Sequence, residues 1–298
     1  MTERQTFSRM AAIIATIVAA SLLAGCAATT RPHPGWGDPE TGLILTYRMP
    51  GKGPLRYRMT STFLQSMDMG GQSMETESNS MTTMSFASRG MREDDLLLKV
   101  TIDEASVSVV APVGVMEGDM SEAIGKSFDM TLSPLGEEKD LPDPNSIQYN
   151  LGDAGKRSAI SSVQMMFPDL PGRPVKVGDS WTTVDGFTEG GGGGEMTISF
   201  ESVNTLVGFE TIDLMDCAVI EADYTGTMKG SGVEGPAKWE SEGELEGASK
   251  WYFAYKQGIL IKDTSELTGT TTVVADTPGG KMTIPTMQDI STETVFLE

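Results

Sequence analysis

Alternation between polar and apolar residues runs through most of this 298-residue chain and restricts its possible folds more than any other feature. A period of two places successive side chains on opposite faces of a β-strand. The stretches at 55–69 and 73–88 flank a Gly-Gly pair, which suits a hairpin turn. Further strand-like stretches follow at 95–110, 127–132, 195–207, 217–228, 248–255, 259–272 and 281–296. The sequence therefore predicts a mainly β protein with long antiparallel strands.

Helix signals are few. Residues 155–167 carry Ile160, Val163, Met166 and Phe167 at helical spacing, and Pro168 follows. We expect one or two short helices, one of them here. The glycine tract at 190–194 precedes a strand-like stretch and has acidic neighbours, so we expect a hairpin loop and not a phosphate cradle. The Gly- and Glu-rich residues 230–247 predict a long exposed hairpin end.

The charge balance excludes one class of partner. The chain has 22 Lys and Arg against 42 Asp and Glu, a formal charge of −20. Without a basic footprint it has no means of displacing counterions from phosphates, so we expect no nucleic-acid partner. One His and two Cys leave little for metal, thiol or triad chemistry, and no Walker A, Gly-x-Ser-x-Gly or HExxH pattern occurs. We therefore expect a protein without enzymatic activity, cofactor or metal.

The first 25 residues have the three parts of an export signal. Arg4 and Arg9 supply positive charge, and the 14-residue apolar stretch at 10–23 is too short to remain as a membrane span. The stretch ends in Leu-Ala-Gly before Cys26, which resembles a bacterial lipobox. The resemblance implies cleavage before Cys26, acylation of this residue with fatty acids such as palmitate, and attachment to a membrane. More than one acyl chain gives stable anchoring.

The mature chain divides into a tether and a domain. Residues 26–41 are rich in Pro and Gly and read as a tether, and residues 42–298 as the β-rich lipoprotein domain. The halves 42–167 and 175–298 are loosely alike but show no residue-level repeat, so one domain or two similar halves both stay open. Lipoproteins of the inner membrane commonly carry Asp after the acylated Cys, whereas here Ala27 follows. We therefore expect the periplasmic face of the outer membrane in preference to the inner membrane.

Methionine is frequent, with 20 residues, and several gather in the first hairpin. The candidate ligand-binding residues are Met67, Met69, Met81 and Met84. Flexible thioether side chains suit an adaptable apolar cleft. They are also ligands for Cu(I), which is a minor alternative. Of these two interpretations we expect the apolar cleft and not the copper site.

Two stretches resemble a known family. Leu132-Ser133-Pro134 is followed by Val175-Lys-Val177-Gly-Asp-Ser-Trp181. The chain is similar to an uncharacterised bacterial lipoprotein family of unknown function that carries an LSPxG hairpin and a VxVGDSW stretch. We expect Val175 and Val177 to face one way, Gly178-Asp179 to turn, and Trp181 to enter the core. The family contributes no catalytic residues.

Long antiparallel strands after a lipobox also resemble the half-barrel lipoprotein carriers of the cell envelope, which hold acyl chains on a concave face. This resemblance implies a curved, half-barrel-like sheet and a lipid or other hydrophobic ligand. The alternative is a structural or protein-interaction module of the envelope, its protein partner unidentified. A continuous apolar cavity lined by Met, Phe and Leu would favour ligand binding, and a solidly packed core would favour the alternative.

Overall fold

The computed structural model describes residues 35–49, 51, 53–68, 71–152, 155–191, 194–234, 237–277 and 280–297. The predicted signal peptide, Cys26 and Met69 lie outside these residues. Trp36 to Glu298 form one compact unit. This unit already includes the last residues of the predicted tether, because β1 (Gly37–Asp38) pairs with β2 (Gly42–Leu43).

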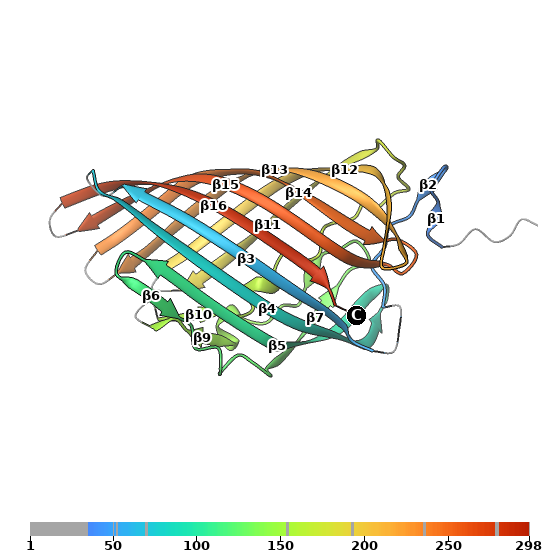
Figure 1. Cartoon of the computed structure of the whole chain (residues 1–298), viewed down its shortest axis with the longest axis horizontal. Coiled ribbons are helices and arrows are strands. Elements are labelled where there is room, and N and C mark those ends of the chain that lie inside the picture. Colours follow the sequence, from blue (N-terminus) through green and yellow to red (C-terminus); the bar gives the residue numbers. More distant parts are fainter. Residues whose placement is uncertain are drawn as a thin grey trace, which may run out of the picture. The chain divides into compact units, whose positions relative to one another are not determined.

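One large antiparallel sheet dominates this unit (Figure 1). From one edge to the other its strands are β11 (Ser180–Gly191), β12 (Gly194–Ile212), β13 (Met215–Glu234), β14 (Ala237–Ala254), β15 (Ile259–Thr277), β16 (Gly280–Phe296), β3 (Leu55–Asp68), β4 (Ser73–Arg92), β5 (Asp95–Ala111), β7 (Ser127–Leu132) and β8 (Glu138–Lys139). A further strand, β6 (Gly114–Glu117), pairs with β5. The sheet is curved and does not close, which confirms the predicted fold class.

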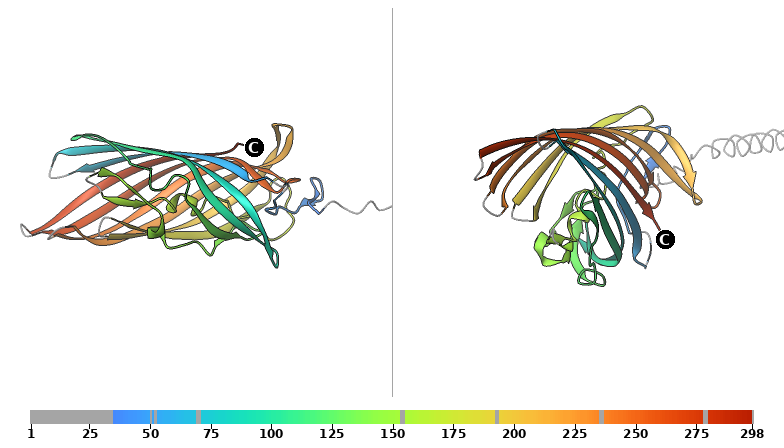
Figure 2. Two further views of the ribbon diagram at one scale, coloured as in Figure 1. Left: turned by 90° about the horizontal axis from the view of Figure 1, so that it is seen from below. Right: turned by 60° about the vertical axis from the view of Figure 1, so that its left-hand side comes forward.

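The chain passes from one edge of the sheet to the other through residues 140–179, here named the crossover. It leaves after β8, carries the short pair β9 (Gln148–Asn150) and β10 (Lys156–Ser158), and enters β11. Figure 2 shows this green segment beneath the arch of the sheet. The face that it covers is named the inner face, and the opposite one the outer face.

The helix expected at 155–167 is wrong. Residues Lys156–Ser158 form β10, and Ser161–Val163 form a single 3-10 turn, as do Pro144–Ser146. Met165 then adopts a left-handed φ of 63°, which stops any continuation. Ile160, Val163, Met166 and Phe167 are buried nonetheless. The helical spacing of these residues thus reflects their burial on one side of the segment. A single 3-10 turn followed by irregular backbone is enough to bury them.

A main apolar core lies between the inner face and the crossover. Its largest fully buried side chains on the sheet are Trp251, Tyr57, Phe86 and Phe253. The crossover contributes a matching set of buried residues: Ile147, Leu151, Ala159, Ile160, Val163, Met166, Phe167, Leu170 and Val175. Burial of each large apolar side chain stabilises the fold by about 1.5–3 kcal/mol. The crossover therefore belongs to the folded core and is not a loose loop.

Candidate functional site

The predicted methionines do not share one surface. Met84 pairs with Tyr57 on the inner face and is fully buried in the main core. Met67 lies on the same face but ten residues further along β3 than Tyr57, about 33 Å at the rise of an extended strand. Met81 pairs with Thr60 and therefore points to the outer face. The structure instead places Met67 opposite Met74, and it does not describe Met69.

A second apolar cluster lies further along the inner face, toward the hairpin ends of β11 and β12. Phe200, Met228 and Leu245 are buried there, on three consecutive strands. Around them lie partly exposed apolar residues of the sheet and one of the crossover: Phe187, Met196, Ile198, Leu267 and Met165. This group is named the second inner cluster.

Glycines on the inner face make room for the second inner cluster. Gly226 is the register partner of Phe200, and a Cβ on Gly226 would lie 2.7 Å from Phe200 Cδ1. Gly269 is the partner of Leu245, whose Cδ2 would lie 2.5 Å from such an added Cβ. Large side chains therefore lie flat over glycines of the adjacent strand. The concave face of a curved sheet is crowded, and this pairing relieves the crowding.

Phe167 connects the crossover to the sheet. Its ring makes edge-on contacts with the rings of Tyr47, Tyr57 and Phe86, at centroid distances of 5.5, 5.8 and 5.3 Å. Its backbone N–H donates to Glu138 Oε1 at 3.0 Å. Such aromatic pairs contribute about 0.5–1.5 kcal/mol each beyond their buried area.

The LSPxG and VxVGDSW stretches both contact residues 168–170 of the crossover. Gly136 has a φ of 112°, and a Cβ there would lie 2.7 Å from the carbonyl oxygen of Pro168. The N–H of Leu170 donates to the carbonyl of Leu135 at 2.7 Å. Trp181 donates from Nε1 to the carbonyl of Asp169 at 3.0 Å. The LSPxG hairpin therefore packs against the crossover just before the chain enters β11.

The roles expected within the VxVGDSW stretch are confirmed in part. Val175 and Trp181 are buried, and Gly178 turns the chain with a φ of 92°. Val177 is 52% exposed, so it does not face the same way as Val175. The turn that Gly178 makes already includes Val177, which breaks the period of two.

Three carboxyl groups lie where the crossover meets β11 and β8. Desolvation raises the pKa of Glu138 to about 8 and that of Asp169 to about 7. Burial also raises the pKa of Asp185, which shares a hydrogen bond with Asp169. The sequence analysis missed this group. Its available signal was the alternation in β11, which places Asp185 on the same face as Trp181.

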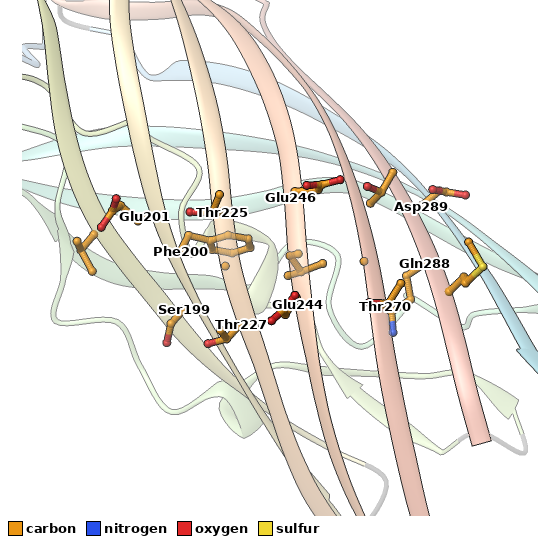
Figure 3. A pocket seen from close by; sticks show the side chains of 16 residues that line it. Ser199, Phe200, Glu201, Thr225, Thr227, Glu244, Glu246, Thr270, Gln288 and Asp289 are labelled. Carbon is orange, nitrogen blue, oxygen red and sulfur yellow. The ribbon is translucent and has the colours of Figure 1, made fainter. Parts of the chain in front are cut away.

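The outer face carries a groove of about 850 Å³. Figure 3 shows two rows of side chains across β12 to β16. One row contains Glu201, Thr225, Glu246 and Asp289; the next contains Ser199, Thr227, Glu244 and Thr270. The exposed apolar side chains of Val184 and Met287 lie at its sides. The groove is thus lined by acids and hydroxyls together with exposed apolar surface.

The four carboxylates of this groove have no ion-pair partner within the part of the chain that the structure describes. Other acids of the outer face do: Glu242 pairs with Lys229, Glu221 with Lys250 and Glu293 with Lys262. The groove is therefore a patch of uncompensated negative charge, whereas acids elsewhere on the outer face are paired with lysines.

The described residues include one free thiol. Cys217 lies buried in β13, and burial raises the pKa of its thiol to about 11. Among the described residues, no group of three or more His, Cys, Asp or Glu side chains could hold a metal ion. No described helix is long and apolar enough to cross a membrane.

Comparison with known proteins gives no family. No family model matches the chain, and no curated protein matches it. Among solved structures, OccK5 (OpdH) of Pseudomonas aeruginosa aligns with 6% identity and a TM-score of 0.27, covering 84% of this chain and 100% of that one. OccK2 (OpdF) of the same organism gives 6% and 0.23, covering 82% and 98%. A DUF1329 family protein of Desulfovibrio piger gives 10% and 0.13, covering 80% and 85%. Scores this low carry no conclusion about function.

Proposed function

We propose that this protein is a lipid-anchored protein of the bacterial cell envelope, without enzymatic activity, that binds a lipid or other hydrophobic ligand on the inner face of its sheet. The anchor is a fatty-acylated Cys26, and the location is the periplasmic side of the outer membrane. The observation that supports ligand binding is the second inner cluster, in which apolar side chains stay partly exposed on a concave surface.

The cluster suits an acyl chain for physical reasons. Ligand sites are concave and mostly apolar, with few polar groups. Phe187, Met196 and Ile198 are only partly buried, so a hydrocarbon chain covering them would remove apolar surface from water. The flexible side chains of Met196 and Met165 can adjust to the occupant.

A protein-interaction module is the alternative, and the outer groove favours it. Its uncompensated carboxylates would attract a cationic partner. The two functions use opposite faces of the same strands, so variants separate them. Loss of ligand through an inner-face change supports the first, and loss of a basic partner through Glu244→Gln with Glu246→Gln supports the second.

The ligand is tested with protein purified from envelopes, by native mass spectrometry and by displacement of a fluorescent fatty acid. Phe187→Asp, on the inner face of β11, should weaken binding at least tenfold. Val184→Asp is the matched control, because Val184 lies on the same strand, 74% exposed and on the outer face. Equal binding by both variants, or no bound lipid in the wild type, would refute the proposal.

The anchor is tested separately. Cys26→Ser should remove the acyl mass from the mature N-terminus and release the protein from the membrane fraction. An unmodified N-terminus in the wild type, with unchanged fractionation of the variant, would refute acylation. The ligand experiment does not depend on this result.

A further inference from the structure

The hairpin between β12 and β13 ends in a strained turn. Ile212 pairs with Met215, so Asp213 and Leu214 alone form the turn, with φ values of 48° and 65°. Two-residue hairpin turns of this kind favour Asn-Gly or Asp-Gly, because left-handed backbone is costly for residues with a Cβ. Leu214 is also 97% exposed. An apolar side chain in a strained position, without burial in its own fold, points to a partner that covers it.

Aromatic rings lie beside this hairpin. Tyr255 makes edge-on contacts with Trp36 at 5.4 Å and with Phe209 of β12 at 6.0 Å between ring centroids. Lys256 Nζ lies 5.5 Å from the Trp36 ring centroid and forms an ion pair with Asp216, two residues after Leu214. These contacts place Leu214 at the end of the sheet where β1 and β2 lie (Figure 1). Phe209, Leu214, Trp36, Tyr255 and Lys256 are named the hairpin end.

The hairpin end is also where the chain arrives from Cys26. Trp36 lies ten positions after Cys26, and ten extended residues reach at most about 36 Å. An acylated Cys26 would therefore hold the hairpin end close to the bilayer. Tyr255 is buried and supports the half-buried Trp36. A Trp side chain favours the interface between membrane and water, and an exposed leucine favours the hydrocarbon below it.

We propose that the hairpin end contacts the bilayer surface, with Leu214 inserted below the headgroups. This inference rests on the proposed acylation of Cys26. Glu210 and Asp213 flank the tip, and Lys256 is already paired with Asp216. The surface that fits is therefore zwitterionic and not anionic.

The test uses the full acylated protein in phosphatidylcholine vesicles. An environment-sensitive NBD label is attached at Leu214→Cys or, as a control, at Val113→Cys. Val113 is 89% exposed in the β5–β6 turn, at the opposite end of the sheet. Buried Cys217 is the same in both variants. At position 214 the emission should shift to the blue and be quenched at least twofold by doxyl-labelled lipid, with no change at 113. Replacing part of the lipid with phosphatidylglycerol should reduce the shift.

Three results would overturn the inference. A label at 214 that stays in water, on protein that is acylated and floats with the vesicles, refutes the bilayer contact and leaves the anchor intact. Protein without acyl mass that does not float refutes the anchor and the contact together. A label shielded by envelope protein extract but not by vesicles assigns the hairpin end to a protein partner.

Discussion

The side chain of Asp169 in the crossover shares a hydrogen bond with the side chain of Asp185 on β11. Two carboxyl groups can make such a bond only when one of them is protonated. The protonation state of this pair therefore affects how the crossover is held against β11. Trp181 of β11 also donates to the carbonyl of Asp169 at this point.

Stability should fall as pH rises from about 5 to 8. The pKa of Glu138 is about 8 in the folded chain against an ordinary 4.5, so within this window the folded chain holds a proton that the unfolded chain releases. Raising the pH then favours unfolding. Each pKa unit corresponds to about 1.4 kcal/mol, so the loss should amount to a few kcal/mol. Glu138→Gln should make the dependence shallower in urea unfolding between pH 5 and 8, leaving the part that Asp169 and Asp185 contribute, whereas Glu75→Gln on the exposed outer face should leave it unchanged.

Trp181 should contribute strongly to stability, because its ring is buried against Trp251 at a centroid distance of 6.2 Å. Trp181→Ala should cost about 3–5 kcal/mol in equilibrium unfolding. Val184→Ala on the exposed face of the same strand should change stability by less than about 0.5 kcal/mol. A cost below about 1 kcal/mol for Trp181→Ala would contradict its place in the core.

The methionines should separate by face. Met84 is fully buried, so Met84→Ala should cost about 2–5 kcal/mol. Met81 lies on the opposite face of the same strand and is partly exposed, so Met81→Ala should cost less than about 1 kcal/mol. Unfolding curves of the two variants check this, and equal losses would contradict the register of β3 and β4.

The inner-face glycines should not tolerate alanine. A Cβ on Gly226 would lie 2.6 Å from the carbonyl oxygen of Ser199 and 2.7 Å from Phe200, so Gly226→Ala should cost about 1–3 kcal/mol. Gly208 in the neighbouring strand has no atom within 4 Å of an added Cβ. Gly208→Ala should be neutral or stabilising by up to about 1 kcal/mol, as measured by thermal unfolding.

The strained turn should be relieved by glycine. Leu214→Gly should raise stability by about 0.5–1 kcal/mol, because left-handed backbone costs leucine about 1–2 kcal/mol and glycine loses some unfolded-state entropy. A stability loss would show that Leu214 packs within the fold, contrary to its exposure.

The sequence by itself determined the strands and their faces. Alternation located the hairpin of β3 and β4 around residues 69–72 and the burial of Trp181, because a period of two is a local property of extended backbone. The β-rich residues 43–49 also predict a strand, but only Gly42–Leu43 forms one. Residues 44–49 alternate in burial without regular pairing, although Leu43 pairs with Val175.

Only the tertiary structure decided what each face meets. Residues 230–247 were expected as an exposed hairpin end, yet they are mostly strand, with Gly243 and Gly247 on the crowded inner face and Glu244 and Glu246 outside. The same long-range packing set the crossover, the Asp169–Asp185 contact and the separation of Met67 from Met84. Local alternation indicates that one face of a strand is buried. The segment that covers this face comes from residues far along the chain, so the curvature of the sheet and the path of the crossover determine which segment it is.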